Sequence, residues 1–140
     1  MLKAEKNLTK HTVARVMTKD VVSAEATEPV RDILQVMADK GIGCVVITEE
    51  SCPTGILTER DIVRRILQKD DILGLQAKEI MTQPLISVTP DTPVIDALNL
   101  MSEKNIRRLP VAQDNRLKGI ITIHSDLLYW VAKESRSEND

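Results

Sequence analysis

The sequence predicts an α/β fold made of two β-α-β-β-α repeats that pack by a pseudo-twofold into one module. The first observation is a doubled stretch, Gly55-Ile56-Leu57-Thr58 followed by Asp61, which returns as Gly119-Ile120-Ile121-Thr122 followed by Asp126. The second is a constant offset of 64 residues, at which 13 of the 42 positions from Met17 to Thr58 are identical. Average composition predicts about two or three matches by chance. The chain is therefore a tandem repeat.

The first repeat opens with a possible helical turn at 13–18 and a short apolar strand at 21–23. Pro29 is typical of a helix start. Apolar residues then recur at the i, i+3, i+4 and i+7 positions of an amphipathic helix, and Gly41 ends it. The members of this stripe are Val30, Ile33, Leu34 and Met37.

The rest of the first repeat predicts a hairpin followed by a helix. The run 44–47 is wholly apolar, which predicts a strand buried on both faces. The polar segment 48–54 is predicted to be a loop and 55–57 the next strand. A helix is expected from Thr58 to about residue 69.

The second repeat follows the same order. Its expected elements are a strand at 85–88, a helix that starts at Pro93 and buries Val94, Ala97, Leu98 and Met101, a strand at 109–111, a loop at 113–118, a strand at 119–121 and a helix at 125–133. A half of about 60 residues is only marginally stable alone, so the two halves are expected to pack together and bury apolar surface against each other. The predicted organisation is a leader at 1–12, repeats at 13–70 and 75–133, and a flexible tail at 134–140.

Composition excludes several classes of protein. A formal net charge of −2 argues against a nucleic-acid binder, which would present a basic face. No segment is long and apolar enough for membrane insertion or a signal peptide. Two cysteines eight residues apart indicate neither a disulfide framework nor a zinc site. The expectation is a cytoplasmic protein with reduced thiols and no required metal or cofactor.

The doubled pattern resembles the CBS domain, named after cystathionine β-synthase, in tandem, an arrangement called a Bateman module. The matching residues are the 16–18 and 80–82 starts, the Ile106–Val111 segment and the two Gly-apolar-apolar-Thr turns with their aspartates. The resemblance covers about 13–133. It implies a regulatory module without catalytic residues, which binds AMP, ADP, ATP, S-adenosylmethionine or a related adenosine ligand in the cleft between the repeats.

The resemblance also implies which residues bind the nucleotide. Asp61 and Asp126 are expected to accept hydrogen bonds from ribose hydroxyls, and Thr58 and Thr122 to contact ribose or phosphate. Adenine is expected near backbone groups of both first strands. The remaining candidates are Val22, Ala24, Arg60, Ser87, Val88, Thr89, Leu109, Pro110, His124 and Ser125.

Two alternatives remain open at these positions. Thr58-Glu59-Arg60-Asp61 also fits a capping box, in which Thr and Asp side chains satisfy backbone donors at a helix start. In addition, Asp126 follows Gly119 by seven residues whereas Asp61 follows Gly55 by six. Ser125 therefore competes with Asp126 for the ribose-binding position.

The second repeat is the expected phosphate site. Arg107 and Arg108 replace Gly43 and Cys44, and guanidinium groups are good phosphate donors. The competing interpretation is a solvated pair at a helix end. On the first interpretation, Arg107, Arg108 and Asp126 bind the charged ligand, while the Asp61 site is weaker or prefers a less charged one.

The sequence thus predicts a sensor that forms a homodimer and signals to an effector protein. Candidate interface residues are Ile62, Ile66, Leu127, Leu128 and Val131, with core packing as the alternative. The rival function is an interaction module with empty clefts. An enzyme that turns over the nucleotide has little support, because no base or nucleophile is placed for it.

Overall fold

The computed structural model describes residues 11–68 and 71–123. The chain divides into two compact units. Among the described residues, the first-repeat unit contains 21–68, 71–86 and 114–117, and the second-repeat unit contains 11–20, 87–113 and 118–123. The mixed α/β fold predicted from the repeat is confirmed.

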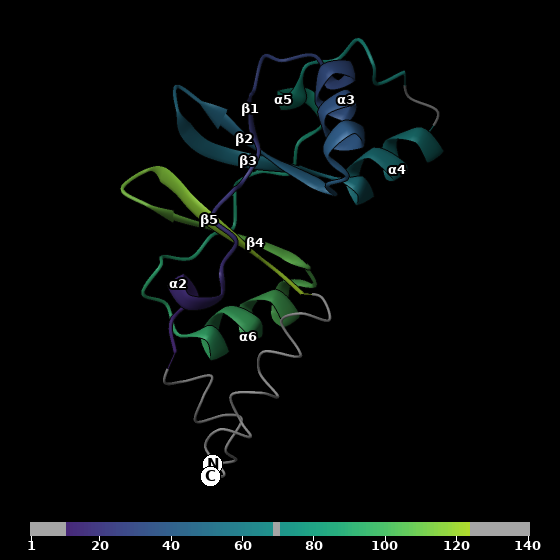
Figure 1. The fold of residues 1–140 in the computed structure, drawn as a ribbon. Helices are drawn as coiled ribbons and strands as arrows, with labels where there is room; N and C mark the ends of the chain where they lie inside the picture. Colours follow the sequence, from purple (N-terminus) through teal and green to yellow (C-terminus); the bar gives the residue numbers. More distant parts are fainter. Residues whose placement is uncertain (1–10, 69–70, 124–140) are drawn as a thin grey trace. The chain divides into compact units, whose positions relative to one another are not determined.

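The first-repeat unit is a three-stranded sheet with three helices (Figure 1). Its strands lie in the order β1-β2-β3, with β1 parallel and β3 antiparallel to β2. The elements are β1 (Ser23–Glu25), α3 (Val30–Lys40), β2 (Cys44–Glu49), β3 (Cys52–Thr58), α4 (Glu59–Leu67) and α5 (Ala77–Ile80).

Helix α3 forms where the periodicity predicts it. Pro29 is the N-cap, and the helix buries Val30, Ile33 and Met37. It ends at Gly41, whose φ of +63° lies in the left-handed region that glycine adopts without strain. The buried side of α3 joins Val45, Ile47 and Leu57 of the sheet and Ala77 and Ile80 of α5 in one core.

The loop predicted at 48–54 is wrong, because most of it is strand. Only Glu50 and Ser51 form the turn, and both have positive φ, at 51° and 68°. Two positive φ values are typical of the tight turns that match the twist of a hairpin. The same correction applies at 113–118, where Asp114 and Asn115 form the turn.

The described part of the second-repeat unit contains one longer helix, one helical turn and a two-stranded sheet. These elements are α2 (Val13–Val16), α6 (Val94–Lys104), β4 (Arg108–Gln113) and, from Lys118 onward, β5 (Arg116–Thr122). Helix α6 starts after Pro93 and ends at Asn105, which has a φ of 53°. Its buried residues Val94, Ala97 and Met101 share this unit with Val13 of α2. The helix expected at 125–133 lies outside the described residues.

The strand expected at 85–88 is wrong; the structure has a single parallel bridge between Val88 and Val111. The physical reason lies in the neighbouring strand. In the first repeat the amide of Val46 donates to Val22 O at 3.1 Å. The residue 64 positions later is Pro110, which has no N–H to donate. The pairing in the second repeat is therefore reduced to two hydrogen bonds of Val88. Its amide donates to Pro110 O, and its carbonyl accepts from the amide of Ala112.

Each unit contains the short segment that comes before the other repeat in the sequence. In the second-repeat unit, Thr18 pairs with Ile120; in the first-repeat unit, Thr82 pairs with Ile56. The two pairs are related by the 64-residue offset. Helical turn α2 thus belongs to the second-repeat unit and α5 to the first-repeat unit.

Candidate functional site

The first candidate site lies where β2 begins and β3 ends. Thr58, the last residue of β3, pairs with Cys44, the first residue of β2. On the other side of β2, the carbonyl of Val22 accepts from the Val46 amide. The hydrogen bonding thus brings Val22 and Thr58 to opposite sides of the start of β2, and α4 begins at the next residue.

Asp61 is fixed at this edge by a capping box. Its Oδ2 accepts from Thr58 N at 2.9 Å and from Thr58 Oγ1 at 3.0 Å. In return, the amide of Asp61 donates to Thr58 Oγ1 at 3.3 Å. The capping interpretation of Thr58 and Asp61 is therefore confirmed. It leaves ligand binding as a second role for the same carboxylate.

The other carboxylate oxygen of Asp61 has a partner that sequence analysis missed. Thr82 Oγ1 donates to Asp61 Oδ1 at 2.8 Å. A carboxylate can accept about four hydrogen bonds, so these three donors leave room for another. Asp61 is half-buried and Thr82 is exposed, so a molecule in solution can reach the pair. The repeated Met-Thr pair, Met17-Thr18 and Met81-Thr82, was the available sign that Thr82 holds a defined position.

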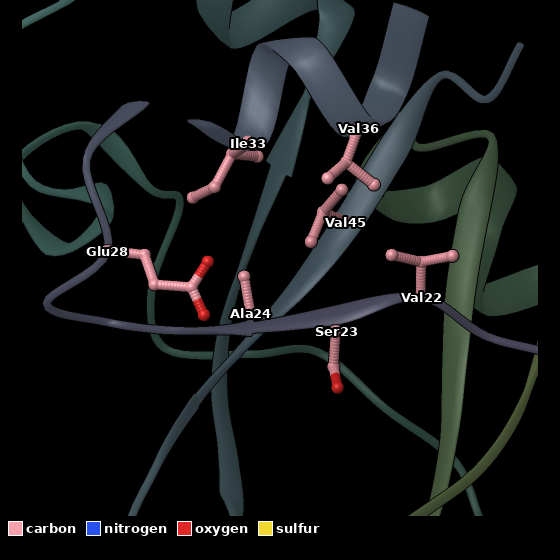
Figure 2. A pocket seen from close by; sticks show the side chains of 7 residues that line it. All are labelled: Val22, Ser23, Ala24, Glu28, Ile33, Val36 and Val45. Carbon is pink, nitrogen blue, oxygen red and sulfur yellow. The ribbon is translucent and has the colours of Figure 1, made fainter. Parts of the chain in front are cut away.

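A small hollow lies beside β1, between that strand and α3. Figure 2 shows Val22 and Ala24 pointing toward Ile33 and Val36 of α3, with Val45 of β2 on the same side and Ser23 pointing the other way. Glu28 directs its carboxylate toward Ala24, and its Oε1 accepts from the amide of Glu25 at 3.1 Å. The space between these side chains is about 210 Å³ even when open solvent at its mouth is counted, which is less than the roughly 300–1,000 Å³ of a drug-sized ligand site. The hollow is therefore not by itself a nucleotide site.

The second repeat places its candidates at the start of β4 and the end of β5. The carbonyl of Arg107 accepts from Ile123 N at 2.9 Å, as that of Gly43 accepts from Glu59 N at 3.0 Å. The scaffold of the first site is therefore repeated as far as Ile123. Arg107 is exposed and Arg108 half-buried, which leaves both guanidinium groups within reach of an anion.

The remaining candidates of the second repeat differ in accessibility. Leu109 and Pro110 are buried, Val88 and Thr122 are half-buried, and Ser87 and Thr89 are exposed. Thr89 donates through its hydroxyl to Asp91 in the turn before α6. Arg60 is exposed on α4 in the first-repeat unit. His124, Ser125 and Asp126 lie outside the described residues.

Comparison with known proteins decides the family. The sequence model of the CBS domain matches residues 13–68 and 77–125. The chain belongs to the CBS domain family. The match occurs twice, so the tandem CBS pair inferred from the repeat is confirmed.

Relatives of this CBS pair occur in several organisms. The chain is 40% identical over 121 residues to protein MK0525 of Methanopyrus kandleri, covering 82% of this chain and 60% of that protein. It is 32% identical over 140 residues to the mitochondrial CBS domain-containing protein CBSX3 of Arabidopsis thaliana, covering 91% and 68%. The chain spans only about a third of two other archaeal relatives, from Thermofilum pendens (34%) and Methanocaldococcus jannaschii (32%).

Solved structures of CBS proteins share the fold. One is a putative signal-transduction protein with CBS domains from Burkholderia ambifaria, with a TM-score of 0.78, 31% identity and coverage of 88% of this chain and 95% of that one. Another is the CBS domain pair of protein MJ0100 in complex with 5′-methylthioadenosine and S-adenosyl-L-methionine. It has a TM-score of 0.77, 26% identity and coverage of 88% and 98%.

Residues 11–68 and 71–123 contain no group of three or more His, Cys, Asp or Glu side chains that could hold a metal ion. No helix within them has the length and hydrophobicity to cross a membrane. Neither Cys44 nor Cys52 takes part in a disulfide bond.

Proposed function

We propose that this CBS pair is a regulatory module that senses an adenosine-containing ligand such as AMP, ADP, ATP or S-adenosylmethionine. The observation that carries the proposal is Asp61, a half-buried carboxylate held at the start of α4 with acceptor capacity to spare. The MJ0100 complex with 5′-methylthioadenosine and S-adenosyl-L-methionine supports adenosine as the shared chemical group.

In this proposal, different residues of the first repeat bind different parts of the ligand. Asp61 accepts from the ribose hydroxyls, because charge-assisted hydrogen bonds to a carboxylate are stronger than neutral ones. Thr58 orients that carboxylate, since its hydroxyl proton is already directed to Oδ2. Backbone groups of Val22 and Ala24 contact the adenine, and Arg60 lies on the same helix as Asp61 to meet a charged group.

The second repeat supplies the stronger phosphate site in the proposal. Arg107 and Arg108 are donors that the first repeat lacks, because Gly43 and Cys44 stand at the corresponding positions. Thr122, Ser87, Val88 and Thr89 complete this site together with Ser125 or Asp126. The first repeat then prefers a ligand with less negative charge.

The function is tested by thermal unfolding at one protein concentration in the presence of AMP, ADP, ATP, S-adenosylmethionine, NAD or GTP. A ligand present at about 100 times its dissociation constant adds roughly 2.7 kcal/mol to the free energy of unfolding. The midpoint should then rise by roughly 5–10 °C. A rise with adenosine compounds and none with GTP supports the proposal. No rise with any compound, after removal of any co-purified ligand, contradicts it.

The alternative function, an interaction module with empty clefts, has one specific observation in its favour. Helix α4 exposes Val63 (53%), Ile66 (57%) and Leu67 (75%) on one face. Ile62 is only 9% exposed and belongs to the core, so of the two α4 residues considered for an interface Ile66 alone is accessible.

We propose a second copy of this chain as the partner of that face. Antiparallel pairing of two α4 helices about a twofold axis packs Val63, Ile66 and Leu67 against the same residues of the second copy, as an isologous interface requires. Among related structures, a CBS-CP12 protein from cyanobacteria is hexameric.

The mass in solution, measured by light scattering, tests this interface. We expect a dimer for the wild type and a monomer for Ile66→Lys. A dimer in both would contradict the assignment. The proposed sensor acts in the cytoplasm, passes its ligand-bound state to an effector protein and catalyses no reaction.

A further inference from the structure

The segment that follows α5 is attached to the edge of β3. Thr82 N donates to Ile56 O at 2.8 Å, and Ile56 N donates to Thr82 O at 3.0 Å. These two bonds form an isolated antiparallel bridge. The backbone of Thr82 is therefore held as firmly as a residue of the sheet, although it lies in a connecting segment.

Gly55 provides the space for this attachment. A Cβ atom at Gly55 would lie 2.6 Å from Met81 Sδ and 2.9 Å from Thr82 O. Both distances are shorter than carbon makes with sulfur or oxygen, so only glycine permits this approach without a shift of the segment. Gly55 thus allows the close approach that sets the position of the Thr82 backbone, and with it the position of the Thr82 Cα atom.

The Thr82 hydroxyl faces the proposed ribose-binding carboxylate. Its proton is donated to Asp61 Oδ1 at 2.8 Å. A threonine hydroxyl has one donor and two acceptor positions, so Thr82 Oγ1 can still accept. Asp61 Oδ1 can also accept one more hydrogen bond. Two acceptors, Oδ1 and Oγ1, therefore stand side by side at about the spacing of neighbouring hydroxyls on a ribose ring.

We infer that Thr82 is a specificity-determining residue that recognises the ribose diol together with Asp61. One ribose hydroxyl donates to Asp61 Oδ1 and its neighbour donates to Thr82 Oγ1. The inference rests on the proposed adenosine binding and adds a residue from outside the repeated turn. It also makes affinity depend on the attachment of the segment after α5, because Thr82 leaves Asp61 whenever that segment detaches from β3.

The test is calorimetric titration with 5′-methylthioadenosine, the less charged ligand expected at this site, and with its 2′,3′-dideoxy analogue, which lacks both hydroxyls. Thr82→Val removes the hydroxyl but keeps the shape of the side chain. We expect it to weaken binding of 5′-methylthioadenosine roughly 3- to 10-fold, the equivalent of one lost hydrogen bond. Binding of the dideoxy analogue should stay within about twofold of its wild-type affinity, since the lost contact has no partner there.

Two further variants separate recognition from folding. Thr82→Ser keeps the hydroxyl and should bind 5′-methylthioadenosine with wild-type affinity. Thr18→Val makes the matching change in the other unit, where Thr18 pairs with Ile120, so it controls for loss of a threonine from a strand-paired segment. If Thr82→Val weakens binding of both ligands equally, or of neither, Thr82 does not recognise the diol. If the wild type binds no adenosine compound, the proposed function itself fails.

Discussion

The carboxylate of Asp61 accepts from a backbone amide and two hydroxyl groups, and these contacts serve both the fold and the proposed site. A helix cap requires only Oδ2, which the capping box uses. The second oxygen faces Thr82 and remains able to accept. The capping box holds the carboxylate in place, so a ligand meets an acceptor that is already oriented.

At the residue scale, Thr58→Ala should separate capping from binding. The variant loses the side-chain cap of α4, which typically lowers the free energy of unfolding by about 0.5–2 kcal/mol. Asp61 keeps its carboxylate, so the affinity for 5′-methylthioadenosine should fall less than in Asp61→Ala. Chemical denaturation and a titration with 5′-methylthioadenosine measure the two effects. A loss of affinity in Thr58→Ala as large as in Asp61→Ala would show that Thr58 binds the ligand directly.

At the element scale, α3 and α6 were predictable, α5 was not, and the hairpins were predictable only in part. The i, i+3, i+4, i+7 stripe after Pro29 depends on burial alone, and burial is visible in sequence. The hairpin ends were drawn too short because Cys52–Thr54 and Arg116–Lys118 are polar or mixed, and such residues also form strands with an exposed face. The turns at Glu50-Ser51 and Asp114-Asn115 lack the glycine that usually indicates them.

The contacts within the candidate site were also predictable only in part. Thr58 and Asp61 were found because they belong to a local motif whose capping role is encoded in four consecutive residues. Thr82 was missed because it reaches Asp61 only through pairing with β3, 21 residues away in sequence from Asp61. The absence of the strand expected at 85–88 depends on Pro110, a residue of the partner strand. Both errors of prediction concern contacts between segments that are distant in sequence.

The Glu50-Ser51 turn gives a prediction about stability. Ser51 has a φ of 68°, where glycine is free of the steric strain that other residues meet. Ser51→Gly should therefore raise the free energy of unfolding by about 0.5–1 kcal/mol. Asn115→Gly should raise it less, because asparagine already tolerates this conformation. Equal or reversed effects in urea denaturation would contradict this account of the turn.

The close approach at Gly55 gives a second prediction for the elements. Gly55→Ala must move Met81 or the Thr82 backbone, so we expect a loss of about 1–3 kcal/mol in the free energy of unfolding. Gly74→Ala is the matched control, because a Cβ there would meet nothing within 4 Å. Similar stability for the two variants would show that the segment after α5 is not held at β3.

At the scale of the whole molecule, the repeat keeps its scaffold and changes its charged groups. The strand bridges and the glycine contacts with methionine recur at the 64-residue offset in both units. Gly43 and Cys44 give way to Arg107 and Arg108 at the same offset. At these two positions the halves therefore differ in the positive charge that they offer an anion.

This asymmetry predicts a difference between charged and neutral ligands. Replacement of Arg107 and Arg108 by alanine should weaken binding of AMP by roughly 10-fold or more, since hydrogen bonds to charged groups contribute about 1.5–3 kcal/mol each. Binding of 5′-methylthioadenosine, which has no phosphate, should change little. Calorimetric titration of both ligands decides it. An equal loss for both would indicate that the arginines do not contact phosphate.

The central claim is that Asp61 binds an adenosine ligand in addition to capping α4. Its most direct test is a calorimetric titration of 5′-methylthioadenosine, the less charged ligand expected at this site, into the wild type and Asp61→Ala. Loss of a charged hydrogen-bonding partner should weaken binding roughly 10- to 100-fold. Circular dichroism at the titration temperature confirms that the variant is folded. Equal affinities in the two folded proteins would contradict the claim and reduce Asp61 to a helix cap.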